Sequence, residues 1–391
     1  MGEYVERRWD ADPSAYGPRR SRASFTYRAF VPDPIAEIDP AVPFETHQLI
    51  AGAEAAVTAL NGDARVADLE AIGALLLRSE AIASSRIEGY GLSQRNLARA
   101  LIDPKAARGT ARTVGANVVA MEESIRLGEV KRSLGSEDLW SIHRTLMGSE
   151  PKARPGQLRA EQNWIGGRLG SPIDARYIPP PETEVPRLMD DLAVFLNRDD
   201  LPAAAQAAIA HAQFETVHPF VDGNGRVGRC LIHVVLRRRG VAPSFVPPVS
   251  IVLAAKPTSY IDGLVAFREG RIAAWCASFA SALERSARLS AELAARVAAL
   301  ETSWFQRAGR PRRDSTAARI LPILPAQPIT SAAVVRDALG VRHQRALEGL
   351  KALEAAGVVR RISERSWDQQ YAADELFELL ERFEESIGSG R

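Results

Sequence analysis

The stretch His218-Pro-Phe-Val-Asp-Gly-Asn-Gly-Arg-Val-Gly-Arg229 is the most informative part of this 391-residue chain. An alanine-rich segment with helical character, residues 203–216, precedes it, and an apolar helical segment, residues 230–236, follows it. The three glycines let successive backbone N–H groups converge, and the start of the second helix adds the positive end of its dipole. The sequence therefore predicts a helix–loop–helix that cradles an anion.

The charged side chains around this loop suit a bound polyphosphate. Arg226 and Arg229 lie three residues apart on the first turn of the second helix, so both guanidinium groups can reach one ligand. Asp222 offers the hard oxygen that Mg²⁺ prefers when it bridges phosphates. His218 ends the first helix, where its imidazole can take a proton from an attacking hydroxyl. Together these residues predict phosphoryl-type transfer.

Two other interpretations of the loop are weaker. Gly223-x-Gly225-x-x-Gly228 is formally a dinucleotide-binding fingerprint, but that fingerprint follows a strand and precedes an acidic residue about 20 positions later. Here a helical segment precedes the glycines, and Arg237-Arg-Arg-Gly-Val-Ala-Pro follows them. The other interpretation is an ordinary turn between helices with surface arginines, which leaves the density of special residues unexplained.

The stretch resembles the signature of the Fic (filamentation induced by cAMP) family, His-x-Phe-x-(Asp/Glu)-Gly-Asn-Gly-Arg-x-x-Arg, and matches every specified position. The resemblance implies transfer of AMP from ATP to a Ser, Thr or Tyr hydroxyl of a protein, the chain itself included. It implies that His218 is the general base, that Phe220 is a buried anchor of the loop, and that Asp222 holds Mg²⁺.

The resemblance also implies which groups bind the nucleotide. Asn224 and the backbone of Gly223 and Gly225 would bind the α- and β-phosphates. Arg226 would contact the β-phosphate side and Arg229 the γ-phosphate. The developing charge would then be met by fixed dipoles, a metal ion and arginines.

A second motif lies far upstream, in Ser84-Ser-Arg-Ile-Glu88-Gly89. It resembles the family's inhibitory motif, (Ser/Thr)-x-x-x-Glu-(Gly/Asn), in the subclass with an N-terminal inhibitory helix. The resemblance implies that Glu88 pairs with Arg229 in place of the γ-phosphate while Ser84 braces the helix. A helix C-terminus capped by Gly89 explains the same residues structurally, and both readings can hold together.

Residues 163–177 predict two short strands around a turn, which resemble the family's flap. The edge of such a hairpin can pair with an extended target segment, with Ile165 and Ile178 as clamp residues. A plain structural hairpin is the alternative. Tyr260, with Asn117 and the Trp275 region, is a candidate for the nucleotide pocket or for the core.

Isolated histidines elsewhere carry less information. His143, His211 and His233 lie in helical surroundings without a cysteine or carboxylate cluster. Core or surface roles are therefore expected for them rather than metal ligation.

The predicted fold is mainly α, a Fic-type helical core with a β-hairpin flap, a helical N-terminal domain and a C-terminal winged helix. The expected segments are an irregular arm (1–43), a helical domain with the inhibitory motif (44–112), the catalytic core (113–300), a linker (301–315) and a winged helix-turn-helix (316–391).

Basic residues mark the recognition helix and wing of the last module: Arg342, His343, Arg345, Lys351, Arg360, Arg361 and Arg365. Acidic residues alternate with them, so contact with DNA, contact with a protein, and a homodimer remain open alternatives.

Composition fits a globular protein with a substantial core. Apolar residues make up 46% of the chain and charged residues 25%, and the net charge of +2 gives no global attraction to nucleic acid or anionic membranes. Two cysteines exclude a disulfide framework. The N-terminus has no apolar stretch like that of a signal peptide, so we expect a cytoplasmic protein without a membrane partner.

The sequence leaves two alternative functions open. One is an enzyme of the same fold with another donor or the opposite direction of reaction, which transfers UMP, phosphocholine or phosphate, or removes AMP with the help of Glu88. The other is a DNA-binding regulator that uses the core only as a nucleotide sensor.

Overall fold

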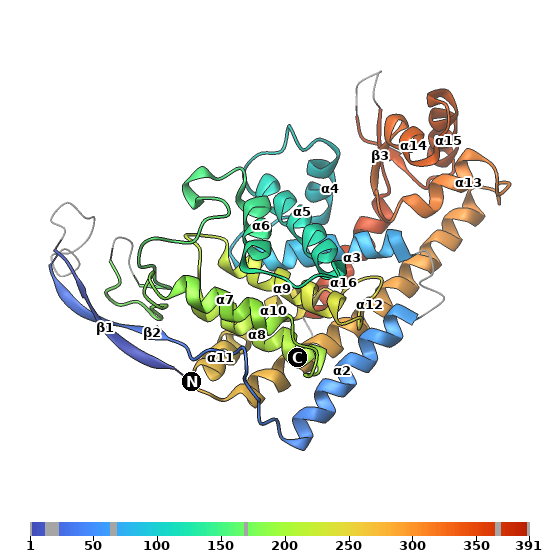
Figure 1. The fold of residues 1–391 in the computed structure, drawn as a ribbon. Helices are drawn as coiled ribbons and strands as arrows, with labels where there is room; N and C mark the ends of the chain where they lie inside the picture. Colours follow the sequence, from blue (N-terminus) through green and yellow to red (C-terminus); the bar gives the residue numbers. More distant parts are fainter. Residues whose placement is uncertain (1, 12–22, 63–68, 168–170, 364–368, 389–391) are drawn as a thin grey trace. The chain divides into compact units, whose positions relative to one another are not determined.

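A computed structural model describes residues 2–11, 23–62, 69–167, 171–363 and 369–388. These residues are mainly helical, as the sequence predicts (Figure 1). The chain divides into two compact units, each made of several segments. The first unit contains residues 1–52, 119–239 and 258–281, and the second contains residues 53–118, 240–257 and 282–391.

The first unit begins with two antiparallel strands, β1 (Glu3–Trp9) and β2 (Phe25–Val31), in register from Glu3↔Val31 to Trp9↔Phe25. The prediction of an irregular arm over residues 1–43 is therefore wrong in this part. Exposure alternates with a period of two along most of both strands, but in β1 the half-buried positions include Arg7 between Val5 and Trp9, so the apolar alternation is not clean.

The core of this unit is built around α8 (Ala203–Val217), in which all 15 residues are buried. Its alanines let neighbouring helices approach closely, and α8 packs against α7 (Val185–Leu196) and α9 (Asn224–Arg238). On another side, the Trp275 indole N–H donates to the Ala208 carbonyl at 2.7 Å. Helices α6 (Ser136–Met147) and η2 (Pro151–Ala153) also lie in this unit, as does α11 (Pro257–Arg268) from residue 258 on, whereas α12 (Ile272–Arg307) passes along the chain into the second unit after Ser281.

The predicted hairpin over residues 163–177 is present in reduced form. Ile165 and Tyr177 make one antiparallel bridge, in which the Ile165 N–H donates to the Tyr177 carbonyl at 2.8 Å. Residues 168–170, at the predicted turn, lie outside the described residues. The Phe30 N–H donates to the Ile178 carbonyl at 3.0 Å, so β2 continues this strand-like region.

The second unit contains α3 (Leu69–Ile87), which packs against α4 (Gln94–Ile102) and α10 (Val249–Ala255). The buried Glu80 carboxylate accepts hydrogen bonds from the Ser250 N–H and hydroxyl, and so caps the first turn of α10. Two further helices, α2 (Phe44–Gly62) and α5 (Gly109–Glu129), cross the boundary between the units along the chain.

The described residues at the end of the chain form four α-helices, one short 3-10 helix and a three-stranded sheet ordered β3-β5-β4. Both strand pairs are antiparallel. Its elements are α13 (Thr316–Ile320), η3 (Leu321–Ile323), β3 (Ile329–Ser331), α14 (Ala332–Leu339), α15 (His343–Ala355), β4 (Arg360–Arg361), β5 (Gln370–Ala372) and α16 (Asp374–Gly388). The identification of this module as a winged helix-turn-helix stays a prediction.

The predicted linker over residues 301–315 begins inside a helix, because α12 continues to Arg307. The buried Trp304 explains this extension, since its indole N–H donates to Glu375 of α16 at 2.7 Å. Both cysteines of the chain, Cys230 and Cys276, are buried thiols.

Among the described residues, no single helix is long and apolar enough to cross a membrane. One bent pair, α10 with α11, reaches the required length and composition together.

Candidate active site

The loop between α8 and α9 contains two residues with left-handed backbone conformations. His218 ends α8 with φ 50° and ψ 60°, and its N–H donates to the Phe214 carbonyl at 2.9 Å. Gly223 precedes α9 with φ 79°, and a Cβ built there would lie 3.0 Å from the Met147 sulfur. A left-handed conformation is easy for glycine and strained for histidine, so His218 is held in place by its surroundings.

Asn224 and Phe220 tie the loop together. The Asn224 amide accepts a hydrogen bond from the Phe220 N–H at 2.8 Å and donates one to the Phe220 carbonyl at 2.9 Å. Phe220 is buried, as the resemblance implies, and its ring stacks on that of His143 with centroids 3.7 Å apart. The Asn224 side chain therefore braces the loop, and its contact with a nucleotide stays a prediction.

His143 gives the loop a second tie that sequence reasoning missed. Its Nδ1 accepts a hydrogen bond from the Gly156 N–H at 2.9 Å, so the ring proton is on Nε2. Nε2 then donates to the Asp222 carbonyl at 3.0 Å. Burial lowers the pKa of His143 to about 4, and the ring is neutral at physiological pH. His143 has the first of the two roles expected for it, core or surface, and the backbone contact is new.

The cationic groups of the site are deeply buried. Arg226 and Arg229 on α9 are each 1% exposed. One Nη of Arg226 lies 3.9 Å from an Asp222 carboxylate oxygen, while the Asp222 side chain itself is 59% exposed. Two buried guanidinium groups beside an exposed carboxylate suit a polyanion together with its metal ion.

The imidazole of His218 is partly exposed at the end of α8. Its side chain is 19% exposed, and its Nδ1 lies 4.0 Å from an oxygen of Glu215, one turn earlier on α8. The ring can therefore be reached from solvent while a carboxylate of the same helix lies next to it. That position suits a proton acceptor.

A magnesium ion fits this donor set only together with a ligand. In the described part of the chain no group of three His, Cys, Asp or Glu residues could hold a metal ion by itself. Asp222 supplies one exposed carboxylate, and Mg²⁺ in nucleotide sites commonly takes one or two carboxylates, with phosphates and waters completing its shell.

The predicted inhibitory segment ends helix α3 in the second unit. Gly89 has φ 86°, its N–H donates to the Arg86 carbonyl at 3.0 Å, and the Tyr90 N–H donates to the Ser85 carbonyl at 2.9 Å. This pair of bonds is a Schellman C-cap, so the structural interpretation of Gly89 is confirmed. Ser84 is buried and Glu88 is exposed, and their inhibitory roles stay predictions.

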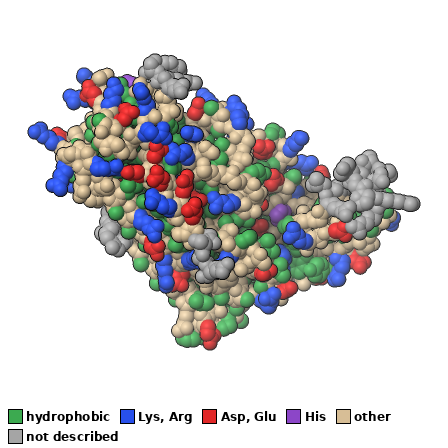
Figure 2. Space-filling view, turned by 180° about the vertical axis from the view of Figure 1, so that it is seen from behind, with side chains coloured by type: hydrophobic (Ala, Val, Ile, Leu, Met, Phe, Trp, Pro, Cys, Tyr) green, Lys and Arg blue, Asp and Glu red, His purple; other side chains and the backbone are tan. Residues whose placement is uncertain are grey.

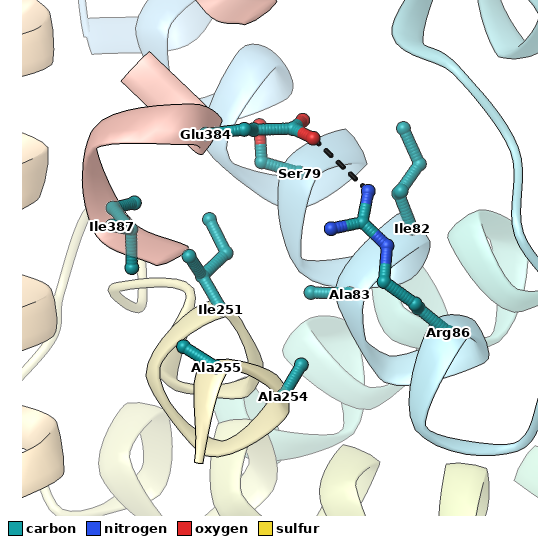
Figure 3. A pocket seen from close by; sticks show the side chains of 9 residues that line it. All are labelled: Ser79, Ile82, Ala83, Arg86, Ile251, Ala254, Ala255, Glu384 and Ile387. Atoms are coloured by element: carbon teal, nitrogen blue, oxygen red, sulfur yellow. Dashed lines mark hydrogen bonds and ion pairs between the residues drawn. The ribbon is translucent and has the colours of Figure 1, made fainter. Parts of the chain in front are cut away.

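A cavity of about 280 Å³ lies beside α3 (Figure 3). Its walls come from α3, α10 and α16, and they are mostly Ile and Ala side chains. Arg86 and Glu384 form an ion pair at 3.0 Å along it, and Gln94 donates to the same carboxylate at 3.0 Å. None of the predicted catalytic or nucleotide-binding residues lines this cavity.

The other predicted residues have different surroundings. Tyr260 is buried, and its hydroxyl lies 2.9 Å from His211 Nε2 in the core beside Trp275. Asn117 is buried in the second unit, where its amide donates to the Ala81 carbonyl at 3.1 Å. These core positions leave a nucleotide contact of Tyr260 as a prediction.

Ile165 and Ile178, the predicted clamp residues, both lie beside the bridge of the hairpin, and Ile165 is exposed. Their side chains remain candidates for contact with a target. Docking of a target stays a prediction.

The basic residues predicted for the recognition helix are exposed on α15, and Arg360 pairs with Asp374. The space-filling view shows Lys and Arg side chains over this module with acidic ones among them (Figure 2). Arg365 lies outside the described residues. Neither DNA nor protein contact is favoured by this surface.

The segment that contains this loop is also the segment that matches known proteins in sequence. Residues 133–236 match the sequence profile of the Fic/DOC family. A protein named protein adenylyltransferase Fic from Drosophila erecta is 32% identical over 114 residues, which are 28% of this chain and 21% of that protein. Protein adenylyltransferase fic-1 from Caenorhabditis elegans is 27% identical over 139 residues, 33% of this chain and 26% of that protein. The matches thus span about a quarter of these relatives.

Solved structures extend the similarity of fold beyond that segment. A Fic family protein from Desulfovibrio desulfuricans G20 matches with a TM-score of 0.56 and 23% identity, covering 86% of this chain and 98% of that one. Fic-1 from C. elegans matches with a TM-score of 0.51 and 22% identity over 63% of this chain and 72% of that one. At these identities the comparison supports the fold alone.

Proposed function

The chain carries a Fic/DOC family domain in residues 133–236, and from that premise we propose that it is a protein adenylyltransferase. It transfers AMP from ATP to a Ser, Thr or Tyr hydroxyl of a protein. One observation carries the proposal: the loop 218–223 places a reachable imidazole next to a helix start with two buried guanidinium groups. A triphosphate is the ligand whose charge and length use both features.

The reaction transfers one nucleotidyl group. The hydroxyl oxygen of the target attacks the α-phosphorus of ATP, and the bond from that phosphorus to the oxygen that bridges the α- and β-phosphates breaks. His218 accepts the hydroxyl proton, and pyrophosphate leaves with the electron pair of the broken bond. The α9 backbone, Arg226 and Arg229 stabilise charge on the phosphates, because buried donors are already oriented before the reaction.

Asp222 is the residue that would hold a magnesium ion on the phosphates. When bound, the ion neutralises phosphate charge and favours departure of pyrophosphate. The His143 bond to the Asp222 carbonyl and the Asn224 bonds to Phe220 fix the backbone on both sides of this carboxylate. These neutral ties orient the loop without adding charge to it.

The proposal includes autoinhibition by Glu88. A carboxylate that pairs with Arg229 takes the position of the γ-phosphate and competes with productive ATP binding. Each bias of about 1.4 kcal/mol toward the blocked state lowers competent binding about tenfold. Ser84, buried within α3, would support that helix. We therefore expect Glu88→Gly to raise AMP transfer.

Intact-mass spectrometry of Glu88→Gly with ATP and Mg²⁺, alone and with a cell lysate, tests the proposal. Addition of one AMP to the chain or to a lysate protein is expected, and Glu88→Gly/His218→Ala should lose it. A different added mass would identify another donor. No transfer by Glu88→Gly, with nucleotide still bound, would instead favour the nucleotide-sensing regulator.

A further inference from the structure

Arg159 lies in the loop between η2 and the predicted flap, outside the family signature. We infer that Arg159 is the positioning residue of the general base, because it binds the carbonyls of the turn that holds His218 in its left-handed conformation. The inference rests on the proposed function and assigns to that site a residue beyond the signature loop. Arg159 acts through the backbone and touches no reacting atom.

The contacts of Arg159 all converge on one turn. Its own N–H donates to the Pro219 carbonyl at 2.9 Å, and its Nε donates to the His218 carbonyl at 2.9 Å. One terminal nitrogen, Nη2, lies 3.5 Å from the Val217 carbonyl. Three successive carbonyls, those of residues 217, 218 and 219, are therefore bound by a single residue.

The remaining donors of Arg159 bind the chain on either side of the predicted flap. Nη1 donates to the Glu161 carbonyl at 3.0 Å, and Nη2 donates to the Pro180 carbonyl at 2.5 Å. Asn163 supports the same turn, since its amide donates to the His218 carbonyl at 3.3 Å and to the Phe220 carbonyl at 3.1 Å. The base and the two ends of the flap are thus joined through one guanidinium group.

Burying a charged guanidinium group costs free energy, so a purely structural role does not explain why an arginine occupies position 159. Arg159 is 3% exposed, and its side-chain hydrogen bonds go to backbone carbonyl oxygens. Burial lowers its pKa to about 10 although the Glu182 carboxylate acts in the opposite direction, so the group still carries its charge at physiological pH. A buried cation whose hydrogen bonds go to backbone carbonyls is retained where its planar fork of five donors is needed.

The donors of Arg159 are needed because His218 has a left-handed backbone conformation. A non-glycine residue adopts this conformation only where the surrounding structure compensates for the strain. Without the Arg159 side chain, the carbonyls of residues 217 and 218 would lose charged donors in a buried place, and the turn would relax toward an ordinary helix end. The imidazole would then leave its position beside the loop 222–229.

NMR of the imidazoles tests this inference without requiring enzymatic activity. The chain has six histidines, so the His218 signal can be assigned by its absence in His218→Ala. In Arg159→Met we expect the His218 signal to shift or broaden while the His211 signal stays in place. The matched control is Arg154→Met, which removes an exposed guanidinium from the same segment and should leave His218 unchanged.

Kinetics of the Glu88→Gly parent provide the second readout. Arg159→Met should lower the rate of AMP transfer about 100-fold, as expected for a displaced reacting group, with the KM for ATP within about threefold. Arg159→Lys, which restores the charge and part of the donor set, should recover about tenfold of the loss. If Arg159→Met does not fold, Arg159→Lys carries both measurements, with a smaller shift of the same signal.

The two measurements separate the inference from the proposed function. An unchanged His218 signal in a folded Arg159→Met or Arg159→Lys protein overturns the positioning role, whatever the activity. A tenfold rise in the KM for ATP at constant turnover also overturns it, because that outcome marks a nucleotide-binding role. A displaced His218 signal supports the inference even if the Glu88→Gly parent shows no AMP transfer, an outcome that would refute only the proposed function.

Discussion

Gly228→Ala would place a methyl group in the close contact between α8 and α9. Gly228 lies in α9 where that helix crosses α8. A Cβ there would lie 2.8 Å from a Glu215 carboxylate oxygen, 3.1 Å from Phe214 Cδ1 and 3.2 Å from His211 Nδ1. All three neighbours are buried, so none can move aside without disturbing the core.

Two opposing terms set the magnitude. Overpacking in a filled core costs about 1–3 kcal/mol, whereas replacing a helical glycine by alanine contributes about 1 kcal/mol of stability. We expect a net loss of up to about 2 kcal/mol in the free energy of unfolding. AMP transfer should fall as well, because the displaced Glu215 carboxylate lies 4.0 Å from His218 Nδ1.

Urea unfolding of Gly228→Ala beside Gly115→Ala isolates the packing term. Gly115 is also helical, in α5, but a Cβ there would meet no atom within 4 Å. The same substitution should therefore stabilise the chain at position 115 by up to about 1 kcal/mol. Equal shifts of both variants, or a more stable Gly228→Ala, would refute the close contact between α8 and α9.

Two further predictions concern the ties that hold the loop. Asn224→Ala removes both hydrogen bonds to Phe220 and leaves the buried Phe220 N–H without its partner. We therefore expect the free energy of unfolding in urea to fall by about 2–3 kcal/mol, together with weaker ATP binding. A variant as stable as the wild type would show that the Asn224 side chain does not hold the loop in place. Lowering the pH tests His143. The pKa of a histidine is about 6.5 in the unfolded chain, whereas the pKa of His143 in the folded chain is about 4. The neutral His143 ring therefore contributes its full stability above pH 6.5, and this contribution is lost as the pH falls toward 4. The wild type should lose about 3 kcal/mol more than His143→Gln between pH 7 and 4; parallel stability curves would contradict the buried neutral ring.

The loop itself could be predicted from sequence because its information is local. The spacing of His218, the glycines and the two arginines specifies a helix end, a turn and a helix start within twelve residues. Burial of Phe220 and the cap at Gly89 follow from the same local chemistry and are confirmed.

The supporting residues could not be found in the same way. Arg159 and His143 bind backbone carbonyls 59 and 79 positions away. Every residue has a backbone carbonyl, so the sequence does not indicate which one is bound. The resemblance assigns Asn224 to the phosphates, which stays a prediction, and the structure adds that its amide binds the Phe220 backbone. Such contacts depend on the packing of α6 and the flap segment around the loop, and that packing is tertiary.

The N-terminal strands were missed for a different reason. The inner face of β1 carries Arg7 between Val5 and Trp9, and the aromatic Tyr4 lies on the exposed face, so apolar and polar residues do not alternate cleanly. The inner face is recognisable only once both strands are aligned. A pairing between segments about 20 residues apart was needed to see it.

Calorimetric titration of Glu88→Gly with ATP and with AMP in the presence of Mg²⁺ decides whether residues 222–229 form a triphosphate pocket. We expect ATP to bind at least tenfold more tightly than AMP, and Arg229→Ala in the same background to remove most of the difference. Equal affinities for ATP and AMP in Glu88→Gly, or an advantage of ATP that survives the loss of Arg229, would contradict the triphosphate pocket.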